Sequence, residues 1–89
     1  HAGIRPGLPL NEQSPQDLVW IRGEFLNDTR VHPWLIVHGH TPIDTATHYG
    51  NRVNLDTGAG YGAPLTAAVF EGRNAWVLSD HGRVPLTPV

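Results

Sequence analysis

The stretch LIVHGHTP, residues 35–42, combines a short apolar run with turn-forming and metal-ligating residue types. The apolar run over residues 34–37, closed by Gly39 and Pro42, predicts a buried strand that ends in a loop. Gly39 allows the backbone to turn, so that an imidazole could meet a metal ion at about 2.1 Å. On spacing alone, either His38 or His40 could be that ligand. Each could equally be a hydrogen-bonded imidazole at a strand end.

Outward from this stretch, the sequence predicts one helix followed by four short strands. Ser14 as N-cap, Pro15 at the first helical position and Asp17 two residues later predict a helix from Pro15 to about Phe25. Gly72 suits a hairpin between the last two strands, which are therefore expected to be antiparallel. The predicted strands cover residues 34–37, 53–55, 65–70 and 75–78, and residues 1–13 and 43–50 are predicted loops.

Composition excludes several functional classes. The 89 residues suffice for one domain at most, and eight acidic residues against six arginines leave no basic surface for nucleic acid. The absence of Cys excludes disulfides, thiolate zinc sites and Cys nucleophiles. No apolar run approaches the roughly 20 residues of a membrane span, so we expect a soluble, cytoplasmic protein with no membrane partner. Trp20, Trp34 and Trp76 lie within apolar patterns and are expected in the core.

Four segments in register carry a family resemblance. HAGI at 1–4, DLVWIRGEFL at 17–26, VHGHTP at 37–42 and NLDTGAGYGAPLTA at 54–67 resemble the C-terminal portion of a bacterial Ser/Thr protein phosphatase of the calcineurin-like metallophosphoesterase superfamily. The resemblance implies an α/β fold tending to α+β, namely part of a two-sheet β-sandwich flanked by helices. Residues 1–89 would be the C-terminal portion of a single domain.

The family motifs D-x-H, G-D-x-x-D-R-G and G-N-H-[ED] do not occur in these residues. They would carry the ligands of the first metal, the bridging carboxylate and the general acid. The resemblance therefore implies a fragment whose N-terminal half is absent, with no catalytic residue of its own. We expect the whole protein to be an enzyme and these residues alone to be inactive.

The same resemblance assigns metal ligands. His1, in the HAG motif, and His40, in the GHTP motif, would bind the same ion of a pair of divalent metals (Mn, Fe or Zn). Many relatives carry a further His where Pro42 stands, so this chain would supply ligands to one ion only. His38 matches no ligand of the family pattern. The resemblance implies that it is structural, or that it supports the ligand residues without binding the metal itself.

The resemblance also names residues that could contact substrate. Arg22 matches an arginine that contacts phosphate, and a guanidinium fork can grip two phosphate oxygens at once. Alternatively, Arg22 is a helix residue whose side chain contacts only solvent. Arg5 is a second candidate for phosphate binding, and Tyr61 could line the substrate groove.

The expected reaction is hydrolysis of a phosphomonoester by a Ser/Thr protein phosphatase acting on a phosphorylated protein or a small phosphoester. Symmetrical hydrolysis of a dinucleoside tetraphosphate is the alternative within the superfamily. Two other classes stay open on the sequence. Asp56 lies in an LDTGA segment typical of retroviral-type aspartic proteases, whose paired Asp residues share a proton. The weakly charged surface would also suit a β-rich binding module that is not an enzyme.

Overall fold

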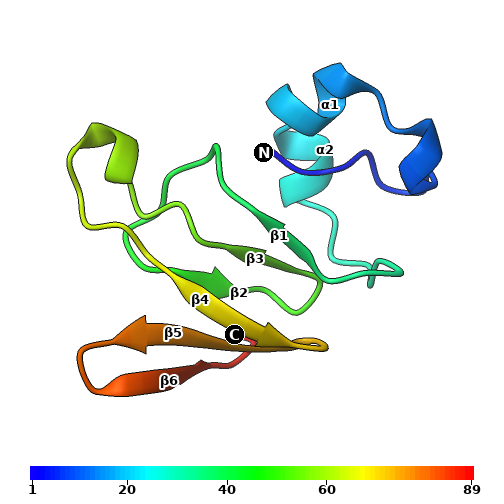
Figure 1. The fold of residues 1–89 in the computed structure, drawn as a ribbon. Coiled ribbons are helices and arrows are strands. Elements are labelled where there is room, and N and C mark those ends of the chain that lie inside the picture. Colours follow the sequence, from blue (N-terminus) through cyan, green and yellow to red (C-terminus); the bar gives the residue numbers. More distant parts are fainter.

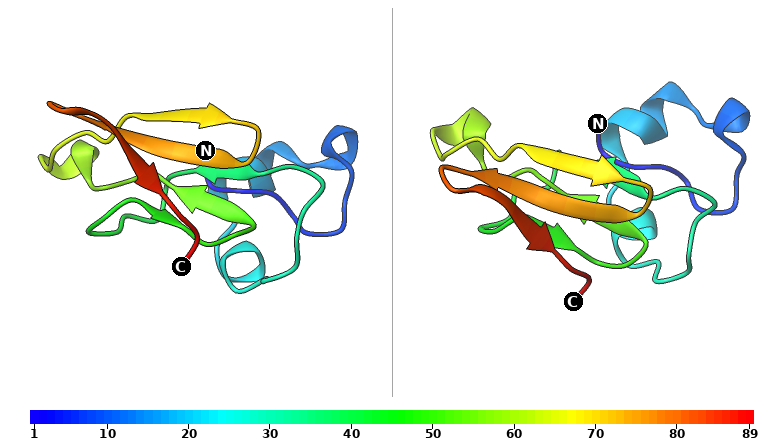
Figure 2. Two further views of the ribbon diagram at one scale, coloured as in Figure 1. Left: turned by 90° about the horizontal axis from the view of Figure 1, so that it is seen from below. Right: turned by 60° about the horizontal axis from the view of Figure 1, so that its bottom comes forward.

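The computed structural model describes residues 1–89 as a small α+β structure, mostly strands with little helix. The first sheet has the order β1-β3-β2 and the second the order β4-β5-β6. The second sheet lies over the first, and the helices with the N-terminal segment lie beside β1 (Figures 1 and 2). The elements are η1 (Leu10–Glu12), α1 (Pro15–Trp20), α2 (Gly23–Leu26), β1 (Ile36–His38), β2 (Thr47–His48), β3 (Arg52–Asn54), η2 (Ala59–Tyr61), β4 (Ala68–Glu71), β5 (Asn74–Ser79) and β6 (Gly82–Leu86).

The predicted helix begins where expected but is two helices rather than one. Ser14 is the N-cap of α1, and its hydroxyl accepts a hydrogen bond from the Asp17 N–H at 3.1 Å. The single helix predicted to about Phe25 is wrong, because Ile21 is extended (φ −57°, ψ 143°) and ends α1. Gly23 lowers helical propensity at the break, and α2 begins there.

All four predicted strands form, with bounds that differ by one to three residues, and two more strands were missed. The hairpin at Gly72 is confirmed, since β4 and β5 are antiparallel. The predicted loop over residues 43–50 contains β2, a two-residue strand too short to leave a periodic pattern. The other missed strand, β6, contains Pro85, which sequence reasoning excludes from central strands. An edge strand tolerates proline because its missing N–H need not complete a ladder.

The first sheet brings two loops to one edge. Strands β1 and β3 are parallel, with Val37 opposite Val53 and His38 opposite Asn54. The carboxyl ends of parallel strands meet at the same sheet edge, so residues 39–43 and 55–58 lie side by side. The backbone confirms this, because the Ile43 N–H donates to the Asp56 carbonyl at 2.9 Å.

The main hydrophobic cluster joins the N-terminal segment to the helices. Ala2, Ile4, Ile21 and Phe25 are buried together, with Phe25 fully inaccessible. Gly3 lies directly beneath the Phe25 ring, where a Cβ atom would stand 2.3 Å from the ring carbon Cδ2. Only glycine therefore allows the HAGI segment to pass this close to α2.

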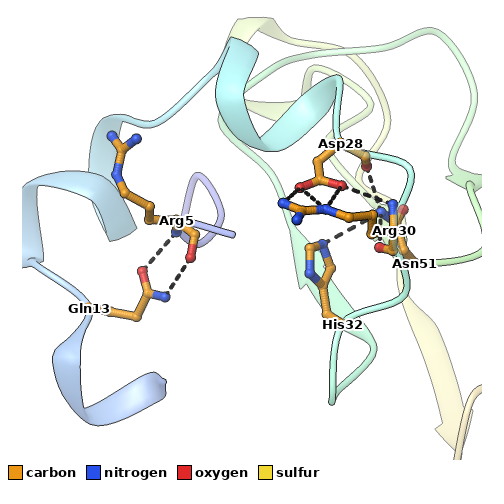
Figure 3. A network of polar contacts seen from close by, with 6 residues as sticks. All are labelled: Arg5, Gln13, Asp28, Arg30, His32 and Asn51. Carbon is orange, nitrogen blue, oxygen red and sulfur yellow. Dashed lines mark hydrogen bonds and ion pairs between the residues drawn. The ribbon is translucent and has the colours of Figure 1, made fainter. Parts of the chain in front are cut away.

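Polar side chains hold the loops around this cluster. The amide of Gln13 accepts from the Arg5 N–H at 2.8 Å and donates to the Arg5 carbonyl at 2.9 Å (Figure 3). The buried Asn51 amide donates to the carbonyls of Asp28, at 2.6 Å, and Arg30, at 3.0 Å. The Gln13 bonds hold the N-terminal loop, and the Asn51 bonds hold the loop that leads from α2 to β1.

Two of the three tryptophans expected in the core are exposed. Trp20 is 65% accessible at the end of α1, and Trp34 is 42% accessible before β1. Both lie next to apolar neighbours in sequence, but their elements turn them outward. The longest helix, α1, has six residues, so none of the helices could span a bilayer.

Replacing Gly3 with alanine is expected to lower the free energy of unfolding by about 2 kcal/mol, because the new methyl group overlaps the Phe25 ring. Gly60→Ala is the matched control, since a Cβ there meets no atom within 4 Å and the backbone needs no positive φ. Urea unfolding of both variants measures the difference. Equal stability of the two variants would contradict the packing of Gly3 against Phe25.

Candidate functional site

The imidazoles of His1 and His40 lie together at the loop edge of the first sheet. Although 39 residues separate them, His1 Nε2 and His40 Nδ1 are 3.1 Å apart. Two backbone bonds bring His1 there. The Gly39 N–H donates to the His1 carbonyl at 2.9 Å, and the Ala2 N–H donates to the Leu18 carbonyl at 2.8 Å.

The spacing of the two nitrogens fits shared metal coordination. Two nitrogen ligands about 2.1 Å from one ion, at about 90° to 110° from each other, lie about 3.0 to 3.4 Å apart. The distance between His1 Nε2 and His40 Nδ1 falls in that range, and in the absence of a metal ion it is also the length of a direct hydrogen bond between the two rings. No third His, Cys, Asp or Glu joins them, because the chain contains no group of three such residues placed to hold an ion. The residues present therefore fit two adjacent positions of a metal site, not a complete one.

His40 has an unusual backbone and an unpaired nitrogen. Its φ of 70° makes it the one non-glycine residue with a positive φ, a conformation that costs a side-chain-bearing residue about 1 kcal/mol. Its Nε2 atom is buried without a hydrogen-bond partner, and the neighbouring Thr41 hydroxyl is buried in the same way. Trp20 covers the ring edge-on, with ring centroids 5.7 Å apart. The Thr41 N–H donates to the Gly39 carbonyl at 2.8 Å and so closes a tight turn around His40, whose imidazole lies beside that of His1.

His38 has both ring nitrogens engaged by other partners. Its Nε2 atom lies 3.0 Å from Arg52 Nη1, and its Nδ1 atom lies 3.1 Å from the Gly39 carbonyl oxygen. Burial lowers the pKa of His38 from 6.5 to about 4, and the charge of Arg52 acts in the same direction. His38 is therefore neutral at pH 7, with no lone pair free for a metal ion. That it supports the ligands stays a prediction.

Asn54 connects the two loops of the site, and sequence reasoning missed it. Its buried amide donates to the Thr41 carbonyl at 2.8 Å, and its Oδ1 atom accepts from the Asp56 N–H at 2.9 Å. The signal in the sequence is an amide between Val53 and Leu55, where a buried strand is otherwise apolar. Asp56, the candidate protease residue, accepts from the Gly58 N–H at 3.1 Å and so shapes its own turn.

The two candidate phosphate-binding arginines differ in their surroundings. Arg5 forms a bidentate ion pair with Asp17, at 2.8 and 2.9 Å, which raises the pKa of Arg5 and lowers that of Asp17. Arg22, in the exposed turn between α1 and α2, makes no side-chain hydrogen bond or ion pair within the chain. Tyr61, on η2, is 87% exposed. The structure therefore leaves the Arg22 guanidinium free for a ligand.

One comparison with known proteins relates to this chemistry. The chain is 40% identical over 47 residues to bis(5'-nucleosyl)-tetraphosphatase PrpE [asymmetrical] from Geobacillus thermodenitrificans (strain NG80-2). This similarity is distant and partial. The matched residues are 53% of this chain and 19% of the relative, so the chain spans about a fifth of the relative's length. No family model and no solved structure matches the chain. The similarity agrees with a phosphoesterase relationship and does not reach a Ser/Thr protein phosphatase.

The left-handed backbone of His40 can be tested by two substitutions that both remove the imidazole. His40→Gly is expected to be more stable than His40→Ala by about 1 kcal/mol, because glycine adopts φ 70° without a Cβ clash. Thermal or urea unfolding compares the two variants. Equal or greater stability of His40→Ala would show that residue 40 is not held in this conformation.

The buried, neutral His38 predicts a pH dependence of stability. Between pH 6.5 and 4 the unfolded chain binds a proton at this residue that the folded chain does not bind. The free energy of unfolding therefore falls as the pH is lowered through this window, by up to about 1 kcal/mol per unit from His38. His38→Gln removes this contribution, so its stability difference from the wild type should shrink from pH 7 to pH 4. A difference independent of pH would contradict the burial of a neutral imidazole.

Proposed function

We propose that this chain belongs to a metal-dependent phosphoesterase, in which His1 and His40 bind one divalent metal ion. The observation that carries the proposal is the 3.1 Å approach of His1 Nε2 to His40 Nδ1. The cost of the strained His40 backbone supports it, because such strain concentrates at functional sites. The partial similarity to a tetraphosphatase supports hydrolysis of a phosphate bond over the protease and binding-module alternatives.

A divalent ion bound to the two imidazoles would polarise a phosphoryl oxygen of the substrate. Zn, Fe and Mn are the candidate metals, with two ions proposed in the whole enzyme and this chain supplying ligands to one. Imidazole suits Zn and Fe in particular, whereas Mn takes more oxygen ligands, which this chain does not place beside the pair. The chain's own contribution is to hold two nitrogens at the spacing of adjacent ligands.

For the substrate, we favour a dinucleoside tetraphosphate over a phosphorylated protein. The relative's name specifies asymmetrical cleavage, which differs from the symmetrical reaction that the sequence left as the alternative within the superfamily. Asymmetrical hydrolysis of diadenosine tetraphosphate yields ATP and AMP, whereas symmetrical hydrolysis yields two molecules of ADP. A Ser/Thr protein phosphatase is the second candidate, because the segments at 1–4, 17–26, 37–42 and 54–67 resemble that branch.

The reaction is tested on the product of the full open reading frame that encodes these residues. Diadenosine tetraphosphate and a phosphoserine peptide are supplied with Mn²⁺, Fe²⁺ or Zn²⁺, and the nucleotide products are separated by chromatography. We expect chelator-sensitive formation of ATP and AMP, reduced at least about 100-fold by His1→Ala and by His40→Ala. Full activity of either variant would remove that residue from the metal site. No turnover of either substrate would contradict the proposed function.

The two arginines provide a matched test of phosphate binding. Arg22→Ala in the same enzyme is expected to raise the inhibition constant of inorganic phosphate about tenfold, because the unpaired guanidinium is available for charged hydrogen bonds. Arg5→Ala is expected to leave the constant within about twofold, because Arg5 is bound to Asp17. The reverse order of the two effects would assign phosphate binding to Arg5.

A further inference from the structure

A chain of hydrogen bonds runs from a buried arginine to the histidine pair. Arg52 Nη1 lies 3.0 Å from His38 Nε2, and His38 Nδ1 lies 3.1 Å from the Gly39 carbonyl oxygen. A guanidinium can only donate, so His38 Nε2 must be the acceptor. The proton of the neutral ring is then on Nδ1, which donates to the Gly39 carbonyl. The arginine thereby determines both the tautomer and the orientation of His38.

Gly39 is the point at which this chain reaches both candidate ligands. Its N–H donates to the His1 carbonyl at 2.9 Å and so anchors the residue that carries the first imidazole. Its carbonyl belongs to the peptide group that continues into His40, whose φ is 70°. This carbonyl accepts from the Thr41 N–H at 2.8 Å and from His38 Nδ1 at 3.1 Å, and the two bonds together hold the peptide plane that sets the direction of the second imidazole.

Arg52 is itself fixed without an acidic partner. It is 8% exposed, it donates to the Leu26 carbonyl at 3.4 Å, and it makes no salt bridge. Its guanidinium carbon lies 3.8 Å from the centre of the Tyr49 ring and 5.8 Å from that of Phe25. Burying a cation away from any carboxylate is costly, and an apolar residue of similar volume would fill this space more cheaply. An apolar residue could replace neither the bond to His38, at 3.0 Å, nor the longer bond to the Leu26 carbonyl and the cation–π contact with Tyr49, and of these three only the bond to His38 reaches the histidine site.

We propose that His38 and Arg52 are positioning residues that hold the imidazoles of His1 and His40 at metal-coordinating distance. Neither residue contacts the metal or the substrate. The metal part of this inference rests on the proposed function, whereas the ring-to-ring placement stands on the hydrogen bonds alone. His38 and Arg52 come from neighbouring parallel strands, so the sheet fixes their separation.

The test uses the product of the full open reading frame that encodes these residues and a matched pair of substitutions at buried histidines. His38→Phe keeps a ring at the edge of Phe25, where the centroids are 5.0 Å apart, but it removes both hydrogen bonds. His32→Phe is the control, since His32 stacks on Phe25 at 6.0 Å and makes no bond to Gly39. His38→Gln keeps one donor and one acceptor, and Arg52→Met removes the cation while keeping a long side chain.

Three readouts separate positioning from folding. Nitrogen-15 NMR of the imidazoles reports the tautomer of His38, a nuclear Overhauser effect between the rings of His1 and His40 reports their proximity, and titration with Co²⁺ followed by absorbance gives a dissociation constant. Thermal unfolding monitors the fold of every variant.

In the wild type we expect the Nδ1–H tautomer of His38 and a ring-to-ring effect between His1 and His40. His38→Phe and Arg52→Met should lose the ring-to-ring effect and weaken Co²⁺ binding at least about tenfold, with partial recovery in His38→Gln and no change in His32→Phe. The inference is overturned if the wild-type His38 carries its proton on Nε2, if the wild-type rings show no proximity, or if a folded His38→Phe variant keeps both the proximity and the affinity.

The outcomes also separate this inference from the proposed function. If the wild type binds no Co²⁺ but its ring-to-ring effect depends on His38, positioning stands and the metal site fails. If Co²⁺ binds with equal affinity to the wild type and to a folded His38→Phe variant, the metal site stands and positioning fails.

Discussion

The close approach of the Phe25 ring to Gly3 is the contact on which the rest of this structure depends. The ring is fully buried, and a Cβ on Gly3 would overlap it. His32 stacks on the ring and His38 meets it edge-on, so one aromatic side chain joins α2 to the segments before and within β1. Because Gly3 is held there, His1 reaches the end of β1. Without this contact, the N-terminal residues would have no fixed position near His40.

The site then follows from a second constraint, the parallel pairing of β1 and β3. Parallel strands deliver their following loops to one edge, which is the usual place for ligands in sheets of this kind. Asn54 joins the two loops, and Gly39 joins the first loop to His1. The sheet thus holds the two loops in fixed positions, whereas the His40 backbone, with its φ of 70°, determines where the His40 imidazole lies. The 3.1 Å spacing of the two imidazoles is the combined result of these long-range bonds.

Local signals in the sequence predicted the local features well. Ser14 and Pro15 mark a helix start, and Gly72 marks a hairpin, because each acts through its own backbone geometry. The residues that depend on distant partners could not be predicted in this way. The bond from Arg52 to His38 joins two strands, and the sequence of neither strand indicates that the other contains its partner. The break after Ile21 and the two-residue strand β2 are likewise decided by tertiary contacts that override weak local preference. His1 and His40 were named as one pair by resemblance, and the structure brings the two rings together.

Paramagnetic NMR with Co²⁺ tests the central claim, that His1 and His40 jointly bind one metal ion, most directly. The product of the full open reading frame that encodes these residues is labelled with nitrogen-15 at its histidines and titrated with Co²⁺. We expect bound Co²⁺ to shift the ring signals of His1 and His40 together by direct coordination, while His38 keeps a neutral ring whose nitrogens remain engaged with Arg52 and Gly39. Coordination by only one of the two rings, or by His38 in place of either, would contradict it.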